Sequence, residues 1–377
     1  MSKKDKIKYY NVRNLVTAIP DAHYYMVIGE RSNGKTYSTL DFCLERYFAK
    51  GEEFAYIRRF DEDIKSSRMK VLFASHISNK LIEKYSNGKW NNIFYYSHAF
   101  YLMKIDPKNP TDRIVSESPI GYAFAISRYE HDKSTSYPNI RNIVFDEFLT
   151  RSSYLADEFI AFTNVLSTLI RLRDDVKIFM LGNTINKYAP YFNEMGLTHI
   201  KDMKVGTREV YTYNGSKLKV VVEFADLPNK SKPSNVYFAF DNPKLNMITG
   251  QNGVWELELY PHLSDDMKYK QKNVLYRYYV CWDTQILECE IVKKDDLLFT
   301  FVHMKTTPIK EDNKNIVYST EHNPKPNYRR KITRALSKAE ERILWFYKRE
   351  KVFYQSNDVG EIMRNYISWC TKTKIEY

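Results

Sequence analysis

The segment from residue 25 to residue 36 constrains the fold of this chain more than any other. It reads Tyr-Met-Val-Ile-Gly-Glu-Arg-Ser-Asn-Gly-Lys-Thr, an apolar run followed by a loop that two glycines bound and that ends in Lys-Thr. This is the G-x-x-x-x-G-K-[ST] pattern of a phosphate-binding loop, in which backbone N–H groups surround an anion and the next helix points its positive end at the phosphates. The segment therefore predicts a strand, a nucleotide-binding loop and a helix.

Each residue type in this loop suits one task. Gly29 and Gly34 let the backbone close around the phosphates. The Lys35 ammonium reaches the β- and γ-phosphates, and the Thr36 hydroxyl is a ligand for Mg²⁺. The alternative is a chance match in an ordinary glycine-containing turn. The predicted nucleotide-binding residues are Gly29, Arg31, Ser32, Asn33, Gly34, Lys35, Thr36 and Tyr37.

A second element of the same site is expected at residues 142–148, Asn-Ile-Val-Phe-Asp-Glu-Phe. A buried parallel strand is a short apolar run, and in a nucleotide-hydrolysing sheet an acidic residue stands at its carboxyl end, beside the phosphate loop. Asp146 is predicted to hold Mg²⁺ through water, and Glu147 to activate the attacking water as general base. The alternative is a solvated acidic turn. Together with the loop, the pair indicates ATP hydrolysis rather than nucleotide binding alone.

Charge and length bound the possible partners. The formal net charge is +12 and the pI is near 9.2, which favours a polyanion, with nucleic acid as the first candidate and a lysine-rich solubilising surface as the alternative. The 377 residues, 43% of them hydrophobic, can bury sizeable cores and predict two or three domains. Four widely spaced cysteines indicate neither a zinc site nor a disulfide framework.

Membrane insertion and secretion are not expected. No run approaches the ~20 apolar residues that span a bilayer. The basic start of the chain has no apolar segment behind it, as a secretion signal would. A reduced, cytoplasmic protein fits these features.

The segments around the loop predict a parallel sheet. Residues 37–50 have apolar residues at helical spacing and end before Gly51, and residues 54–59 read as the next strand. This strand–helix–strand order implies parallel strands. Arg58 and Arg59 stand at the strand's end, where they either contact nucleotide or a neighbouring subunit or pair with the acids at 61–63.

Other polar residues near the predicted sheet are weaker candidates. Residues 9–23 contact the adenine through Tyr10, Asn11 or Arg13, or are a packing segment. Residues 64–120 predict an excursion of short strands and helices without a readable function. The loop 128–139 offers Arg128 and Lys133 for contacts with DNA or with the next subunit's nucleotide, against solvated loop charges as the alternative.

A helix is predicted over residues 158–173, ending in Arg171 and Arg173, and a strand over 176–183. An arginine at a helix end near the active edge of the sheet can stabilise transition-state charge in an adjacent subunit, whereas the alternative is a charge that complements the helix C-terminus. Asn183, at the tip of its strand, is expected to bond the attacking water or the γ-phosphate.

The pattern changes after residue 207. Residues 208–222 predict a hairpin with a type I′ turn at Asn214-Gly215, and residues 226–253 look like a linker. Residues 273–292 predict a second hairpin, followed by a strand at 297–303. A basic segment then leads into a helix over 341–352; its charges either grip phosphates or form a solvated face.

The chain resembles a known family, the genome-packaging ATPases of small protein-primed tailed bacteriophages. The matching features are the phosphate loop 29–36, Tyr-Ile-Arg-Arg at 56–59, the long run 133–148, Arg171-x-Arg173 and Asn183. The resemblance covers the first ~225 residues well and the rest only in general style.

The resemblance implies a fold and an assembly. The implied fold is α/β: a P-loop NTPase domain of the additional-strand ring-ATPase type with a parallel-rich sheet (1–225), a linker (226–253), and a smaller α+β C-terminal domain (254–377) resembling a degenerate RNase H-type nuclease. The implied assembly is a homo-oligomeric ring, a pentamer, on the portal (connector) of a procapsid in the host cytoplasm. It uses ATP and Mg²⁺ to move double-stranded DNA, with a structural RNA scaffold as an open possibility.

By the same resemblance, Arg171 is the arginine finger acting in trans and Lys133 acts near the subunit boundary. Glu147, Arg171, Asn183 and Lys133 are thus the predicted catalytic residues, and Thr36 and Asp146 the metal-binding ones. Asp283 stands without a convincing acidic set, which makes DNA cleavage doubtful. Two alternatives remain: a terminase-like or helicase-like ATPase with an active nuclease, and a non-hydrolysing, nucleotide-gated capsid adaptor.

Overall fold

The structure of the chain is a computed structural model. It describes residues 9–30, 33–128, 135–150, 154–155, 157–183, 189–226, 260–282, 285–309 and 314–372. The chain divides into two compact units, the first of residues 1–151 and 157–255 and the second of residues 152–156 and 256–377. The predicted linker lies almost entirely outside the described residues, and the predicted domain limits stay predictions.

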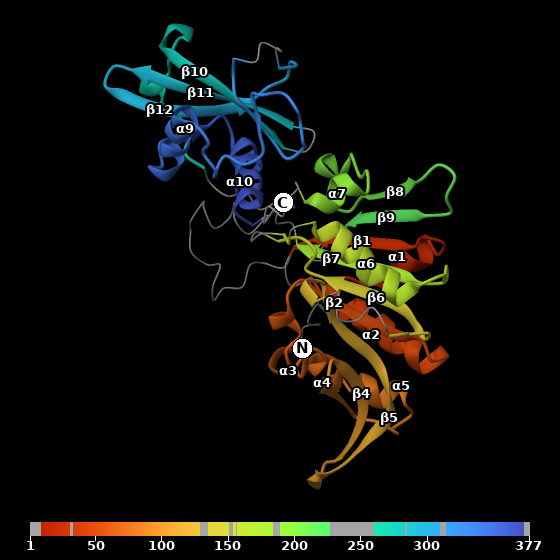
Figure 1. Cartoon of the computed structure of the whole chain (residues 1–377). Helices are drawn as coiled ribbons and strands as arrows, with labels where there is room; N and C mark the ends of the chain where they lie inside the picture. Colours follow the sequence, from red (N-terminus) through yellow and green to blue (C-terminus); the bar gives the residue numbers. More distant parts are fainter. Residues whose placement is uncertain are drawn as a thin grey trace, which may run out of the picture. The chain divides into compact units, whose positions relative to one another are not determined.

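The first unit is built on a nine-stranded sheet with the order β3-β4-β5-β2-β6-β7-β1-β9-β8 (Figure 1). Its six central strands, from β5 to β9, are parallel neighbours, as the strand–helix–strand order predicts. The strands are β1 Tyr24–Gly29, β2 Glu53–Arg58, β3 Asn92–Tyr96, β4 Ala99–Asp106, β5 Asn109–Ala125, β6 Ile140–Asp146, β7 Lys177–Asn183, β8 Arg208–Thr212 and β9 Lys219–Phe224.

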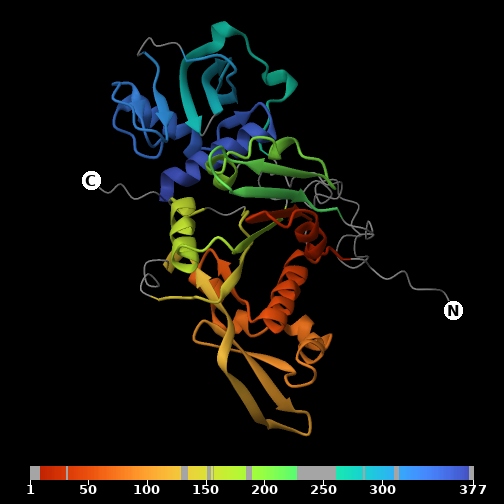
Figure 2. The same ribbon diagram turned by 90° about the vertical axis from the view of Figure 1, so that its right-hand side faces the viewer.

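Helices cover both faces of this sheet, as the view in Figure 2 shows for α2 and α6. Alternate residues of β6 explain this arrangement, because they point to opposite faces. Val144 packs in the cluster that holds Leu40 of α2, whereas the Phe145 ring lies 4.9 Å from that of Phe162 in α6. The helices are α1 Val12–Ala18, α2 Lys35–Lys50, α3 Ser66–Met69, α4 Ala74–Ser78, α5 Leu81–Tyr85, α6 Glu158–Ile170 and α7 Pro190–Glu194.

The predicted excursion between β2 and β5 is confirmed. It contains a 3-10 turn over residues 61–64, the short helices α3 to α5, and the antiparallel strands β3 and β4. Strand β5 is long: its first part pairs with β4, and only residues 121–125 pair with β2. The β4–β5 hairpin extends away from the parallel strands (Figure 1).

The hairpin predicted at 208–222 is present, but its turn is not the two-residue type I′. Thr212 pairs with Lys219, so residues 213–218 form a longer loop. Gly215 has φ 76°, whereas Asn214 is not in the left-handed region that a type I′ turn also requires there. The loop nevertheless lets β9 return beside β1 and extend the parallel part of the sheet.

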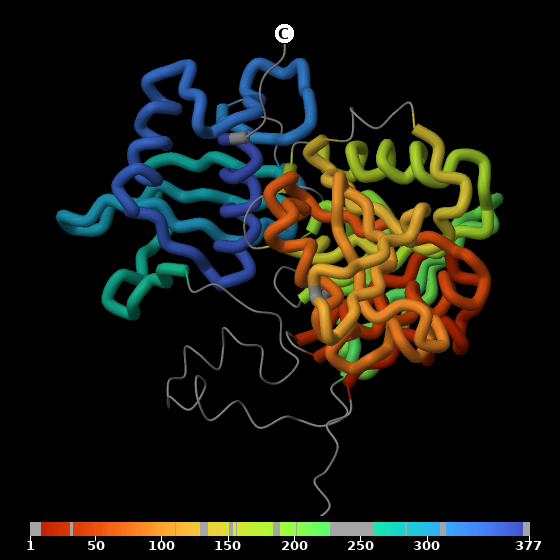
Figure 3. The backbone as a smooth tube through the Cα atoms, turned by 90° about the horizontal axis from the view of Figure 1, so that it is seen from below, coloured from red at the N-terminus to blue at the C-terminus, as the bar shows by residue number. Residues whose placement is uncertain are grey.

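The second unit is built on a six-stranded sheet with the order β14-β13-β10-β11-β12-β15. Its long strands β10 to β12 appear as neighbouring teal to light-blue tubes in Figure 3. The antiparallel hairpin predicted at 273–292 corresponds to β10 and β11, and β12 continues the antiparallel series. The elements are β10 Val274–Trp282, β11 Gln285–Lys294, β12 Leu297–Met304, β13 Val317–Ser319, β14 Tyr328–Arg329, α9 Lys338–Lys348, β15 Val352–Tyr354 and α10 Asn357–Lys372.

The helix predicted over 341–352 begins earlier and ends earlier than expected. Ser337 caps α9 by accepting a hydrogen bond from Glu340 N, and Val352 starts β15, which pairs in parallel with β12. Within the described part of the chain, we find no helix that combines the length and the apolar character needed to cross a bilayer.

Candidate active site

Lys35 ends the predicted phosphate loop and is the first residue of α2, six positions after Gly29, the last residue of β1. Its side chain is buried, and Nζ donates to four oxygens: Gly29 O at 3.1 Å, Glu30 O at 2.7 Å, Asn33 Oδ1 at 3.1 Å and Asn183 Oδ1 at 3.3 Å. Burial lowers the pKa of Lys35 to about 8. The loop therefore holds a desolvated amine among neutral acceptors, and an anion would favour the charged form of this amine.

The glycines of the loop have steric reasons to be glycines. Gly34 has φ 91°, and a Cβ there would lie 3.0 Å from Cβ of Tyr9. A Cβ on Gly29 would lie 2.9 Å from Asn33 Nδ2. This Nδ2 is buried and has no hydrogen-bond partner in the described parts of the chain, while Oδ1 of the same side chain accepts from Lys35 N at 3.2 Å. Asn33 thus supplies a buried donor inside the loop, suited to a phosphate oxygen.

Asp146 and Thr36 meet at the end of β6. The Thr36 hydroxyl donates to Asp146 Oδ1 at 3.1 Å, and the Tyr56 hydroxyl of β2 donates to Asp146 Oδ2 at 2.9 Å. Burial raises the pKa of Asp146, and the nearby Arg58 opposes this shift. A carboxylate and a hydroxyl in contact are oxygen ligands of the kind that Mg²⁺ prefers, so the pair fits the predicted metal.

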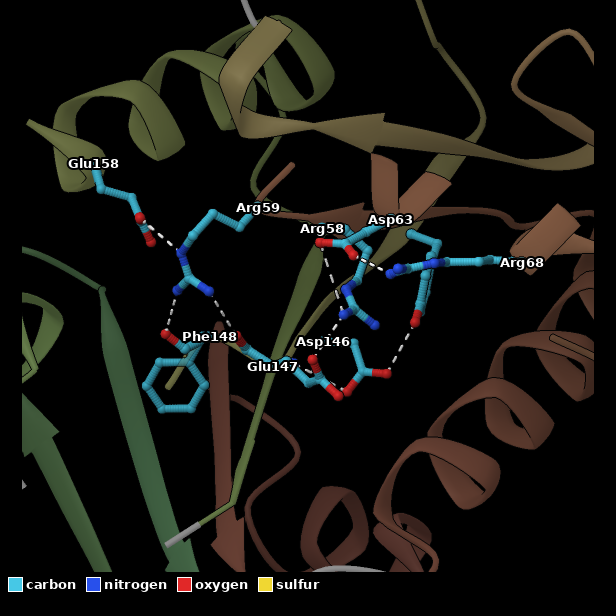
Figure 4. A network of polar contacts seen from close by, with 9 residues as sticks. Arg58, Arg59, Asp63, Arg68, Asp146, Glu147, Phe148 and Glu158 are labelled. Carbon is cyan, nitrogen blue, oxygen red and sulfur yellow. Dashed lines mark hydrogen bonds and ion pairs between the residues drawn. The ribbon is translucent and has the colours of Figure 1, made fainter. Parts of the chain in front are cut away.

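Glu147 follows the last residue of β6 and turns away from it. Its φ is 58°, a left-handed conformation that costs a non-glycine residue ~1–3 kcal/mol. Its carboxylate accepts from Arg58 Nη2 at 2.7 Å, and Arg58 also lies 3.9 Å from Asp63, which pairs with Arg68 (Figure 4). The predicted base is therefore adjacent to the predicted metal ligand but held in an ion pair.

The two arginines at the end of β2 have different partners. Arg58 pairs mainly with the Glu147 side chain. The alternative prediction, a pair with the acids at 61–63, holds only for its longer contact with Asp63. Arg59 pairs with Glu158, the first residue of α6, at 2.8 Å and does not pair with the nearer acids. Arg128 instead pairs with Asp61 at 3.0 Å.

Arg171 lies at the opposite edge of the sheet from the phosphate loop, and the premise that its helix end is near the active edge is wrong. Helix α6 begins beside the carboxyl end of β6 and returns antiparallel to it, so Arg171 precedes the amino end of β7. Its Nη2 donates to Thr135 O at 3.1 Å, ahead of β6. It has φ 55° and ψ −121°, a strained conformation.

Arg173 is occupied with backbone carbonyls at the same edge. Its Nη1 donates to Pro138 O and to Ile140 O, both at 2.7 Å, and Nη2 donates to Leu169 O. It joins the end of α6 to the start of β6.

Asn183 is placed as predicted, at the tip of β7 between β6 and β1. It pairs in register with Gly29 and accepts from Lys35 Nζ. Tyr37 directs its ring away from the loop: it stacks on His76 with centroids 4.2 Å apart, and its hydroxyl accepts from Asn79 at 3.0 Å. Arg31, Ser32 and Lys133 lie outside the described residues.

In the segment before β1, the contacts of Tyr10 and Arg13 favour the packing interpretation over an adenine contact. The Tyr10 hydroxyl is buried against Glu223, and Arg13 pairs with Asp41 and Glu45 of α2 at 2.9 and 2.6 Å. Asn11 caps α1 by accepting from Arg13 N. Tyr10 N donates to Asn33 O at 2.9 Å, so this segment is attached to the phosphate loop by its backbone.

Two residues beside the site were given no role in the sequence analysis, although Tyr56 belongs to the run 56–59 that supports the family resemblance. Tyr56 contacts Asp146 from the neighbouring strand, and a tyrosine within an otherwise apolar strand was the available signal. Tyr9, which is largely exposed, lies against Gly34, and no sequence pattern distinguishes it from the many other tyrosines.

Among the described residues of the second unit, one cluster has the composition of a metal site. Glu288, Glu290 and His303 lie on β11 and β12 with their ligand atoms within 4.8 Å of one another. The carboxylates are already paired: Arg277 reaches both, at 3.1 and 2.9 Å, and Lys305 reaches Glu288 at 3.0 Å. A neutralised cluster does not fit a divalent cation. Asp283 lies outside the described residues.

Comparison with known proteins identifies the family. A model of the Podovirus DNA encapsidation protein (Gp16) family matches residues 4–211. The DNA packaging proteins of Bacillus phage phi29 and Bacillus phage PZA are each 28% identical to this chain over 191 residues, which are 50% of this chain and 50% of each relative. The chain thus spans about half the length of the curated relatives it matches.

Solved structures show the same fold. The structure of the Phi-28 gp11 DNA packaging motor aligns with 98% of this chain and 99% of its own, with TM-score 0.56 and 19% identity. The bacteriophage Phi-29 viral genome packaging motor assembly aligns with 95% and 99%, with TM-score 0.51 and 16% identity. The fold is therefore the mixed α/β, largely parallel-sheet class found in phage DNA packaging motors.

Within that class the family match extends over more than half of the chain. The chain belongs to the Podovirus DNA encapsidation protein (Gp16) family.

Proposed function

We propose that the chain is an ATP-hydrolysing motor subunit that moves double-stranded DNA into a procapsid. The observation that carries the proposal is the meeting of Lys35, Thr36 and Asp146 at the carboxyl edge of the parallel sheet, with Glu147 next in the chain. Ligands bind at this edge in open α/β sheets. The family match adds DNA packaging to the chemistry of the site.

Each residue of the site has a separate role in hydrolysis. Lys35 and the donors of the loop, including Asn33 Nδ2, bind the phosphates. Thr36 and Asp146 would hold Mg²⁺, which neutralises charge on the β- and γ-phosphates when bound. Glu147 takes the proton of the attacking water once its carboxylate leaves Arg58, and Asn183 orients the water or the γ-phosphate.

A second subunit completes the site. Arg171 lies too far from its own phosphate loop because α6, with 13 residues at ~1.5 Å each, runs ~20 Å from one edge of the sheet to the other. In a closed ring, pentameric by family resemblance, this arginine serves the next subunit's γ-phosphate. Lys133 is proposed to act at the same boundary.

The partners follow from the same proposal. Basic surface, reflected in the net charge of +12, grips DNA phosphates independently of sequence and in a salt-sensitive way. The ring docks on the portal of the procapsid in the host cytoplasm, with or without a structural RNA. The second unit is proposed to be a vestigial RNase H-type domain. Its antiparallel strands β10, β11 and β12 are followed by β13 and β14, which both run parallel to β10. Its neutralised Glu288–Glu290 cluster argues against an active nuclease.

The test is phosphate release by the full chain with and without double-stranded DNA. Wild type is expected to be stimulated by DNA, and Glu147→Gln to bind ATP but not hydrolyse it. Wild-type turnover in Glu147→Gln would refute the assignment of the base. ATP affinity without any turnover would favour the nucleotide-gated adaptor, and Mn²⁺-dependent cutting of plasmid DNA that survives Lys35→Ala would favour the nuclease alternative.

A further inference from the structure

Arg59, the residue after β2, directs its guanidinium at the backbone around Glu147 (Figure 4). The residue is only 5% exposed, and all three guanidinium nitrogens donate hydrogen bonds. Nη1 donates to Glu147 O at 3.1 Å, Nη2 to Phe148 O at 2.7 Å, and Nε to Glu158 Oε2 at 2.8 Å. One planar group thus binds two consecutive peptide carbonyls and a carboxylate.

These two carbonyls lie where the strand ladder no longer supplies donors. The pairing of β6 with β7 ends at Asp146 and Leu181, and Phe148 N still donates to Leu181 O at 3.2 Å. Phe148 is buried, and a buried carbonyl without a donor is costly; the left-handed φ of Glu147 adds strain at the same point. Arg59 supplies both donors and stabilises the turn in this conformation.

The guanidinium is itself fixed from the far side. Glu158, 2% exposed, supplies the counter-charge, and the Tyr191 hydroxyl donates to its other oxygen at 2.7 Å. The Arg59 guanidinium also lies 5.9 Å from the centre of the Phe145 ring. A rigid support of this kind is what a site needs to hold a reacting group in one geometry.

We propose that Arg59 is a positioning residue for ATP hydrolysis: it holds the peptide carbonyls of Glu147 and Phe148 so that the Glu147 carboxylate is presented beside Asp146. The inference rests on the proposed role of Glu147. The neighbouring arginines then act on different parts of one residue, since Arg58 contacts the side chain of Glu147 and Arg59 its backbone.

The test compares Arg59→Lys with a matched control in the full chain. Lysine keeps the positive charge for Glu158 but lacks the planar fork that reaches two carbonyls. Arg329→Lys is the control, because Arg329 in the second unit also joins a buried carboxylate to two backbone carbonyls: Nε donates to Glu340 at 2.9 Å, and Nη1 alone donates to the carbonyls of Pro326 and Tyr328 at 2.6 and 2.8 Å.

Arg59→Lys is expected to lower kcat about 10- to 100-fold, the scale of a displaced catalytic group, and to leave KM for ATP within about twofold. Arg329→Lys is expected to cost a similar amount of thermal stability while keeping the wild-type kcat. Glu158→Gln, which removes only the counter-charge, is expected to lower kcat less than Arg59→Lys does. If Arg59→Lys does not fold, Glu158→Gln is the variant that tests the proposal.

A double substitution separates positioning from general structural support. If Arg59 acts through Glu147, then Arg59→Lys added to Glu147→Gln changes the residual single-turnover rate by less than about twofold, because coupled residues are not additive. Wild-type kcat in the Arg59 and Glu158 variants, or a full additional loss in the double variant, would overturn the proposal. Wild-type turnover in Glu147→Gln alone would instead refute the proposed function.

Discussion

The burial of the Lys35 amine allows us to predict how many protons the protein takes up when nucleotide binds. In the free protein burial lowers its pKa to about 8, from an ordinary value of 10.5. The negative charge of a bound triphosphate favours the charged amine and raises this pKa again. Nucleotide binding above pH 8 must therefore take up a proton at this group.

The size of the uptake follows from the pKa. At pH 8.5 a group of pKa about 8 is ~25% protonated, and one restored to 10.5 is ~99% protonated, so binding takes up ~0.7 proton. At pH 7 the free amine is already ~90% protonated, and the uptake falls to ~0.1 proton. Because protons are taken up, nucleotide affinity must fall as the pH rises from about 8 towards 10.5.

Calorimetric titration with a non-hydrolysable ATP analogue and Mg²⁺ measures this uptake. The same titration in two buffers of different ionisation enthalpy gives the number of protons bound, at pH 7 and at pH 8.5. Lys35→Arg is the control, since arginine stays charged at both values and contributes no uptake. Equal uptake at the two pH values in the wild type would refute the claim that the loop desolvates the amine.

Three further predictions concern the loop, the metal and the distant arginine. Gly34→Ala places a Cβ 3.0 Å from Tyr9 at φ 91°, and a fluorescent nucleotide titration should show at least about tenfold weaker binding, with wild-type affinity contradicting the steric argument. Asp146→Asn removes the charge at the Thr36 contact, so the Mg²⁺ concentration for half-maximal hydrolysis should rise about tenfold or more; an unchanged Mg²⁺ profile would remove Asp146 from the metal site. Arg171→Gly relieves the strain at φ 55°, so its free energy of unfolding should be ~1–2 kcal/mol higher than that of Arg171→Ala, and equal stability would count against the strain. Both variants should lose activity that a Glu147→Gln subunit restores in mixed rings, and no restoration would count against the trans role.

Features that are local in the sequence were predictable. The phosphate loop and the Asp146-Glu147 pair have fixed spacing, and apolar runs placed β1, β6 and β7 within a few residues of their observed bounds. The parallel order followed from the alternation of strands and helices. What lies between β2 and β5 was recognised as an excursion, but its long β4–β5 hairpin was not, because residues 111–118 of β5 are mostly polar and exposed and carry little periodic signal.

Features that depend on distant pairing were not predictable. Arg59 and Glu158 are 99 positions apart, and nothing near either residue selects the other over the closer acids at 61–63. The position of Arg171 was misjudged because a helix between parallel strands returns to the opposite edge of the sheet, so its C-terminal end lies away from the phosphate loop. The hairpin turn at 213–218 was misjudged because Asn-Gly suggested two residues where strand pairing leaves a longer loop.

The most direct test of the account is DNA uptake by purified procapsids supplied with this chain, ATP and genomic DNA, measured as DNA protected from nuclease. The account predicts protection that requires ATP and Mg²⁺, disappears with Lys35→Ala and with Glu147→Gln, and weakens with rising salt. Protection that persists in Lys35→Ala, or ATP consumption by the wild type without any protected DNA, would contradict it.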